Sequence, residues 1–311
     1  MSAQQALVVS RRARPAAGRG ELREAITGWA FSAPFLILFL VFLALPILAS
    51  FLISFTDFSL GNLVDPLSAP FIGLKNYGRL FQDGKFLQAS LTTAIFVMFG
   101  VIFNLLVGLA AALALNRGIS RFRAIFRVGY YIPVVTSIVA IAVIWRFLFN
   151  ADFGLINGLL STVGVKGPDW LANPTLAVII IVALLVWRNF GNAMIIFLAG
   201  LQGIPQDLYE AARIDGANGW QEFRHITLPM LRPTTLFLTV WTTIGFLQIF
   251  EEPFVMTQGG PLNKTLTLSM YVYQQAFNFF HQGYASAIAY TLFVVIAAIT
   301  FIQFRFLRSE T

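Results

Sequence analysis

The chain has 311 residues, of which 58% are hydrophobic and 11% are charged, with a formal net charge of +7. Its mean hydropathy of +0.76 is too high for the surface of a water-soluble protein, so the composition excludes a soluble domain and indicates an integral membrane protein. The chain has no cysteine, which excludes disulfides, thiol catalysis and cysteine-based metal sites.

The N-terminal segment, residues 1–25, is polar and interrupted by glycine and proline, which predicts a flexible cytoplasmic tail. The remaining residues, 26–311, form the expected membrane domain. Six stretches in it are apolar enough to cross a hydrocarbon layer about 30 Å thick, which takes roughly 20 helical residues. They are continuous apolar runs, which predicts helices and not barrel strands. The expected spans are residues 29–55, 89–115, 128–149, 176–201, 236–256 and 284–306.

Basic residues are distributed unevenly between the two sides of the expected membrane. If both termini lie on one side, that side receives fourteen of the 21 lysines and arginines, the other side receives five, and two fall within spans. Because basic residues concentrate in cytoplasmic loops, both termini are expected in the cytoplasm. This distribution explains the net charge without nucleic acid as a partner. The five outer residues are Lys75, Arg79, Lys85, Lys166 and Lys264.

The outer connections, near residues 56–88, 150–173 and 257–283, are each too short for a sizeable soluble domain. The longer inner connection, residues 202–233, has amphipathic helical character. Pro205 suits the first turn of a short helix, and Gly216 is expected to leave that helix through a left-handed backbone conformation. The apolar residues that recur at helical spacing are Ile204, Leu208, Ala211 and Ala212.

A second short helix is predicted directly after Gly216. Asn218 is placed to cap it, it is expected to begin at Gly219, and Pro229 is expected to end it. The loop would then be a helix, turn and helix with an apolar side for docking. Its expected polar contacts to a partner are Glu210, Arg213, Asp215, Glu222 and Arg224.

A pattern of fixed spacing runs through this loop: Glu-Ala-Ala from Glu210, then Gly216, then Ile-x-Leu-Pro from Ile226. It resembles the cytoplasmic loop of importer-type ABC transporter permeases. The resemblance implies an all-α membrane protein with the type I ABC importer permease fold, and it implies that the loop is a coupling helix held in a cleft of an ATP-binding subunit. A loop lying on the membrane surface is the alternative. The implied coupling residues are Glu210, Ala211, Ala212, Asp215, Gly216, Ile226, Leu228 and Pro229.

Three outer segments narrow the resemblance, namely residues 71–77, 150–157 and 257–261. With the loop, they resemble the first of the two permeases in maltose, lactose and glycerol-3-phosphate type importers. This implies a bacterial-type cytoplasmic membrane, a second homologous permease, two ATP-binding subunits and an extracytoplasmic solute-binding protein. The chain has no phosphate-binding Gly-x-x-x-x-Gly-Lys-[Ser/Thr] loop, so it is expected to bind no cofactor and to be non-catalytic, with ATP and Mg²⁺ held by the partner ATPase.

Polar residues within membrane spans mark a pathway or a contact between helices. Two clusters combine aromatic faces with hydrogen-bonding groups, as a sugar requires. The first consists of Trp187, Arg188, Asn189, Phe190 and Asn192. The second consists of Thr242, Phe246, Gln248, Ile249 and Glu251.

Arg188 leaves two interpretations open. It can select an anionic substrate, or it can pair with Glu251 or Glu252. Those two acids can instead lie near the outer mouth, close to Arg146 or to the solute-binding protein. His225 and His281 are isolated, which disfavours metal and acid–base roles.

These observations predict a permease subunit that translocates a sugar or a related polyol. The alternatives are a permease for a glycerol phosphate or another phosphorylated solute, and a stand-alone secondary transporter. Against the secondary transporter are the complete loop pattern and the lack of a convincing inverted repeat. The spans also lack a catalytic constellation of His, Asp, Glu or Ser, which disfavours a membrane-embedded enzyme.

Overall fold

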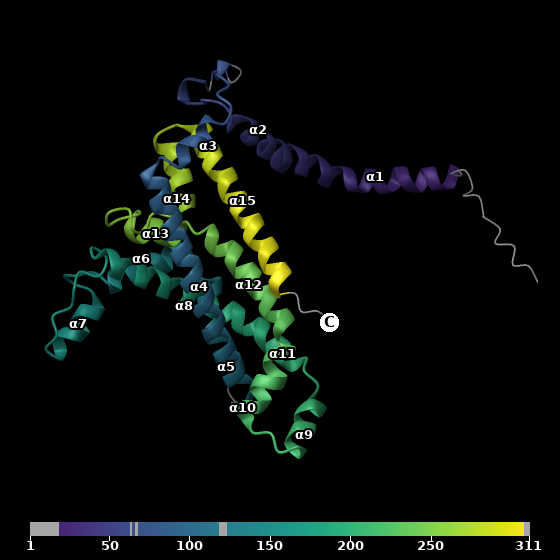
Figure 1. The fold of residues 1–311 in the computed structure, drawn as a ribbon, viewed down its shortest axis with the longest axis vertical. Coiled ribbons are helices and arrows are strands. Elements are labelled where there is room, and N and C mark those ends of the chain that lie inside the picture. Colours follow the sequence, from purple (N-terminus) through teal and green to yellow (C-terminus); the bar gives the residue numbers. More distant parts are fainter. Residues whose placement is uncertain (1–18, 63, 66–67, 118–122, 308–311) are drawn as a thin grey trace, which may run out of the picture. The chain divides into compact units, whose positions relative to one another are not determined.

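A computed structural model describes residues 19–62, 64–65, 68–117 and 123–307. Their regular structure is helical, apart from a β-bridge between Thr56 and Phe71, which confirms the all-α class (Figure 1). The chain divides into two compact units, one up to Leu52 and the other from Ile53 onward.

The first unit is a long apolar helix. It comprises α1 (Arg19–Phe39), a π-helical turn (Leu40–Ala44) and α2 (Leu45–Ile53), which extends one residue into the second unit. Residues 23–53 are long and apolar enough to span a membrane. The helix begins at Arg19, so residues 19–25 of the expected tail are helical, and residues 1–18 lie outside the described part. An apolar surface on all sides suits lipid or another membrane helix.

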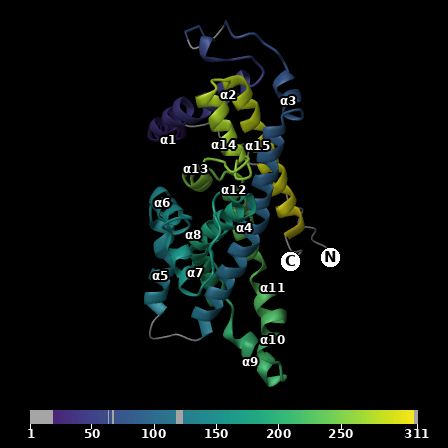
Figure 2. The same ribbon diagram turned by 90° about the vertical axis from the view of Figure 1, so that its left-hand side faces the viewer.

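The second unit contains the remaining helices. They are α3 (Lys75–Leu80), α4 (Gly84–Arg117), α5 (Arg123–Val135), α6 (Ile138–Leu148), α7 (Leu155–Thr162), α8 (Pro174–Gln202), α9 (Gln206–Ile214), α10 (Gly219–Glu222), α11 (Leu228–Met230), α12 (Arg232–Leu247), α13 (Glu251–Thr257), α14 (Leu268–Tyr273) and α15 (Gln282–Leu307). Helices α9 to α11 lie at one end of this unit, and α3 and α14 lie at the other (Figures 1 and 2).

Four of the six expected spans are helices long and apolar enough to cross a membrane, and the other two are broken. Helices α5 and α6 meet at 95°, and α12 and α13 meet at 42°, so the described chain has six spans if each bent pair crosses once. The second break has a local cause. Pro253 has no N–H to donate to the carbonyl of Ile249, so the helix stops and restarts with the proline in the first turn of α13.

Helices α4 and α8 pack closely in the middle of the second unit. A Cβ added to Gly108 of α4 would lie 2.7 Å from the Cβ of Ala193 on α8, and one added to Gly191 of α8 would meet the carbonyl of Tyr130 on α5. Small residues at such contacts let membrane helices approach one another.

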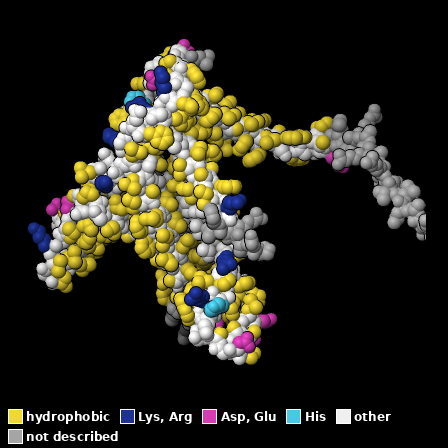
Figure 3. Space-filling model, viewed as in Figure 1, with side chains coloured by type: hydrophobic (Ala, Val, Ile, Leu, Met, Phe, Trp, Pro, Cys, Tyr) yellow, Lys and Arg dark blue, Asp and Glu magenta, His cyan; other side chains and the backbone are white. Residues whose placement is uncertain are grey.

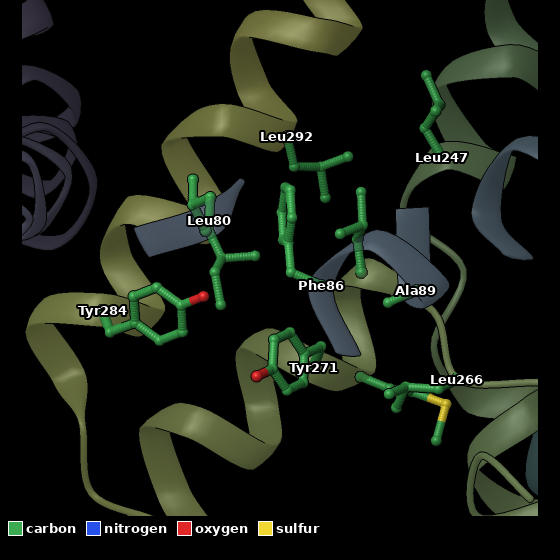
Figure 4. Close-up of a cluster of buried hydrophobic side chains, with 11 residues drawn as sticks. Leu80, Phe86, Ala89, Leu247, Leu266, Tyr271, Tyr284 and Leu292 are labelled. Carbon is green, nitrogen blue, oxygen red and sulfur yellow. The ribbon is translucent and has the colours of Figure 1, made fainter. Parts of the chain in front are cut away.

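Buried apolar side chains form three clusters that all include α4. The first lies where α4 begins and contains Phe86, Tyr271 and Tyr284 (Figure 4). The third lies where α4 ends and holds Ile204, at the start of the inner loop, against Leu115 and Leu231. The inner loop is thus anchored to the rigid core.

The outer motif at residues 71–77 stabilises the fold. The buried Asn76 side chain donates hydrogen bonds to the carbonyls of Ser54 and Thr56, both at 2.9 Å. The hydroxyls of Tyr77 and Ser54 lie 2.8 Å apart. These bonds satisfy backbone groups after the first span and fix α3 to them.

Candidate functional site

A cavity of about 170 Å³ lies between α4, α8, α12 and α13, near the middle of α4 and α8. Its polar lining combines amide, guanidinium, carboxyl and hydroxyl groups with two aromatic rings. Those side chains are Asn104 from α4, Arg188, Asn189 and Asn192 from α8, Trp241, Thr242 and Phe246 from α12, Gln248, and Glu251 and Glu252 from α13.

Eight of the ten expected pathway residues line this cavity, and Trp187 and Phe190 do not. Trp187 contacts Trp145 on α6 with ring centroids 5.7 Å apart, and Phe190 contacts Tyr130 on α5 at 5.5 Å. Consecutive residues point around a helix, so one hexapeptide cannot present all its side chains to one side. The aromatic rings at the cavity are those of Trp241 and Phe246.

Arg188 and Glu252, which both line the cavity, form an ion pair. The Arg188 Nη1 and Glu252 Oε1 atoms are 3.7 Å apart, and the Glu252 side chain is 5% exposed. This is one of the pairings that the sequence left open. Arg146, the other basic residue considered, lines a separate hollow with Asp152 and Asp169.

Two buried polar atoms at the cavity have no hydrogen-bond partner among the described residues, Arg188 Nε and Asn104 Oδ1. Such groups cost roughly 1–3 kcal/mol when they remain unsatisfied. A bound solute with hydroxyl groups offers both a donor and an acceptor for them.

Sequence reasoning missed Asn104 and Trp241, and it left the depth of Glu252 undecided. Asn104 was detectable, because a single amide in an apolar span is a pathway signal. Trp241 carried no comparable signal, since aromatic residues also occur on lipid-facing sides of spans.

The inner loop, which we call the coupling loop (residues 202–233), has much of the expected shape. Gly216 follows α9 with a φ of +83°, and the Ala217 N–H donates to the Ala212 carbonyl at 2.9 Å, which closes the helix end. The Asn218 side chain caps α10, and the Asn218 N–H donates a hydrogen bond to the Gln221 side-chain oxygen at 2.7 Å. Pro205 is the N-cap of α9 and not part of its first turn.

Two further expectations for this loop are wrong. Pro229 does not end the second helix, because a π-helical turn at Phe223–Thr227 leads directly into α11, which contains the proline. The wider π turn gives room where a proline ring would otherwise meet the preceding turn. Glu222 is not free for a partner: it is buried and pairs with Arg213, with Nε and Oε1 2.8 Å apart.

The exposed side chains of the loop are acidic, basic and apolar, and the basic ones include Arg213 and Arg224. Glu210 and Asp215 are exposed, as are Ile214 at 86% and Trp220 at 66%. The sequence pattern did not single out these two apolar residues. Charged side chains gather at this end, whereas apolar side chains cover much of the long helices on the face in view (Figure 3). A rigid, anchored loop with apolar tips can dock into a groove of another protein.

Comparisons with known proteins agree with this geometry. The family model described as "Binding-protein-dependent transport system inner membrane component" matches residues 104–309. The chain is 37% identical over 284 residues to the lactose transport system permease protein LacF of Rhizobium radiobacter, covering 90% of this chain and 93% of that protein. It is 35% identical over 289 residues to the trehalose/maltose transport system permease protein MalF of Thermococcus litoralis, covering 91% and 94%.

A solved structure shares the fold over nearly the whole chain. A bacterial ABC transporter involved in the import of the acidic polysaccharide alginate matches with a TM-score of 0.82 and 25% identity, covering 93% of this chain and 97% of that one. The family match, the relatives and this fold agree on one assignment. The chain belongs to the binding-protein-dependent transport system inner membrane components, the multi-pass permeases of ABC importers.

Proposed function

We propose that this permease carries a neutral sugar or polyol through the cavity between α4, α8, α12 and α13. The observation that supports this most directly is the lining, which offers amide and hydroxyl groups beside the rings of Trp241 and Phe246. Sugars have apolar C–H faces that stack on such rings and hydroxyls that need paired hydrogen bonds. Relatives named for lactose and for trehalose or maltose support the same substrate class.

Charge disfavours a phosphorylated solute. The cavity lining contains one cation, Arg188, and two carboxyl groups, Glu251 and Glu252. Because Arg188 already pairs with Glu252, its charge is offset before a substrate arrives. An acidic substrate is named for the alginate importer, so the fold itself does not exclude anions. The preference for a neutral solute therefore rests on the side chains of this cavity.

The chain would work as one part of a larger assembly. We infer that a second permease completes the pathway, that two ATP-binding subunits hold ATP and Mg²⁺, and that this chain is non-catalytic. The coupling loop would lie in a groove of one ATP-binding subunit, with both termini in the cytoplasm. A solute-binding protein would deliver substrate at the opposite end, as the alginate transporter solved with its periplasmic protein suggests.

Two variants on α8 test the cavity. We expect Asn192→Leu to reduce uptake of radiolabelled lactose, maltose or trehalose by at least tenfold, because an amide that faces the solute is lost. Trp187→Leu is the matched control, since Trp187 lies on the same helix outside the lining. Uptake is measured in vesicles that contain the assembled importer. Normal uptake by Asn192→Leu, or an equal loss in both variants, would contradict the proposed pathway.

The charge argument has its own test. Removing only one member of a buried ion pair leaves the other charge unpaired and costs about 3–5 kcal/mol of stability. The double variant Arg188→Met with Glu252→Gln avoids this cost because it removes both charges. If the solute is neutral, the double variant loses the Arg188 hydrogen bonds but no charge that the solute needs, so its uptake should fall no further than that of Asn192→Leu. If the solute is a sugar phosphate, the same variant loses its uptake. That result would contradict a neutral substrate and favour a phosphorylated one.

A further inference from the structure

An apolar groove of about 550 Å³ runs between α4 and α8, apart from the proposed pathway. It lies toward the end of the second unit that is opposite the coupling loop, because most of its residues come from the first half of α4 or of α8. Its lining includes Leu91, Ile95 and Phe99 on α4 and Val178, Ile179 and Val182 on α8. Leu91 and Ile179 are more than half exposed, so the described chain leaves the groove open.

One end of this groove is polar. Gln88 and Lys264 both line it, and the Lys264 ammonium donates to the Gln88 side-chain oxygen at 3.1 Å. The Thr92 hydroxyl donates to the Lys264 carbonyl at 3.2 Å, which holds the lysine at the groove's mouth. Among the described residues no carboxylate pairs with Lys264. An ammonium has three N–H donors, so two remain for a ligand.

The length of the groove matches one half of a membrane. Its apolar stretch from Leu91 to Phe103 is about 18 Å long at 1.5 Å per residue, close to half of a hydrocarbon core about 30 Å thick. The acyl chain of a phospholipid spans the same half of the hydrocarbon core, so it can lie along the groove.

We propose that this groove binds an anionic phospholipid, with an acyl chain between α4 and α8 and the headgroup phosphate on Lys264. The apolar stem and the unpaired cation at one end match the two parts of such a lipid. The lipid would fill a surface gap in the helix pair that carries much of the cavity wall.

The test uses the assembled importer, stripped of lipid in detergent and titrated with phosphatidylglycerol or phosphatidylcholine under native mass spectrometry. We expect phosphatidylglycerol to bind more tightly, and Lys264→Gln to weaken its binding about fivefold. Ile179→Trp fills the groove and should weaken both lipids. Lys166→Gln, which removes another exposed lysine of the outer connections, should change neither.

Three results would overturn the proposal. The first is unchanged phosphatidylglycerol binding by Lys264→Gln, and the second is equal binding of the two lipids by the unaltered importer. The third is lipid binding that Ile179→Trp leaves unchanged, which would mean that the lipids bind elsewhere on the importer. None of these depends on which solute is transported.

Discussion

Asp83 accepts four hydrogen bonds at the point where α4 begins. The hydroxyls of Tyr271 and Tyr284 each donate at 2.6 Å, and the N–H groups of Lys85 and Phe86 donate at 2.9 and 3.3 Å. Burial alone would raise the pKa of Asp83, but these bonds to the charged form outweigh it and hold the pKa below its ordinary value. One carboxylate thus joins α4, α14 and α15.

We expect Asp83→Asn to lower Tm by roughly 3–6 °C, because bonds to a charged group contribute on the order of 1–2 kcal/mol at a partly exposed site. The folded pKa is depressed, so this stability is fully present above the unfolded value of about 3.9 and is lost as the pH falls through the lower folded value. The Tm difference between variant and parent should therefore be constant above about pH 5 and shrink below about pH 4. Thermal unfolding in detergent measures it.

The exposed Asp152 provides the control for this measurement. Asp152→Asn should leave Tm nearly unchanged at every pH, because no described group donates a hydrogen bond to its side chain. A Tm difference for Asp83→Asn that persists unchanged at pH 3 would show that the carboxylate charge is not what stabilises this junction.

At the scale of elements, the bend between α9 and α10 depends on Gly216. Its φ of +83° is costly for any residue with a Cβ, although open space surrounds the position. We expect Gly216→Ala to destabilise the bend by about 1–2 kcal/mol and to lower transport-coupled ATP hydrolysis in the assembled importer about five- to tenfold. Gly219→Ala is the matched control, because Gly219 has equal space and no positive φ. ATPase rates with and without substrate-loaded binding protein measure the effect.

Gly216→Asn refines this test, since asparagine tolerates the left-handed conformation better than alanine. It should recover part of the coupled rate. Equal rates of coupled ATP hydrolysis for Gly216→Ala and Gly219→Ala would show that the bend at Gly216 is not needed for coupling.

Continuous spans were predictable, and breaks within spans were not. The helices at 84–116, 174–202 and 282–305 follow from hydropathy, because a continuous helix satisfies its own backbone in lipid. The bend after Val135 falls at Thr136 and Ser137, and the bend after Leu247 falls at Gln248. These polar interruptions are short, so an average of hydropathy over a long window passes over them. Pro253 was the available signal for the second bend.

The predictability of the cavity differed between its two walls. On α12, Thr242 and Phe246 are four residues apart, a spacing that puts both on one face of a helix, and both line the cavity. On α8, the residues were chosen as a contiguous group, and two of the five face neighbouring helices instead. The pairing of Arg188 with Glu252 depends on the bend before α13, which the sequence did not reveal.

At the scale of the whole molecule, orientation in the membrane decides whether the coupling loop can reach an ATPase. The uneven distribution of basic residues predicts that the loop is cytoplasmic. The chain has no cysteine, so a single introduced thiol is its only maleimide target. Ile214 is the last residue of α9 and is 86% exposed, and Leu262 lies in the connection between α13 and α14 and is 79% exposed, so both suit this purpose.

We expect a membrane-impermeant maleimide to label Leu262→Cys but not Ile214→Cys in spheroplasts, and to label Ile214→Cys in inside-out vesicles. Both should react in denaturing detergent, which controls for thiol reactivity. Because Ile214 sits at the tip of α9, co-expression of the ATP-binding subunit should slow its labelling in inside-out vesicles and leave Leu262→Cys unaffected. Labelling of Ile214→Cys in spheroplasts would show that the membrane orientation is the opposite of the predicted one. If the ATP-binding subunit does not slow the labelling of Ile214→Cys, the docking surface lies elsewhere on the loop.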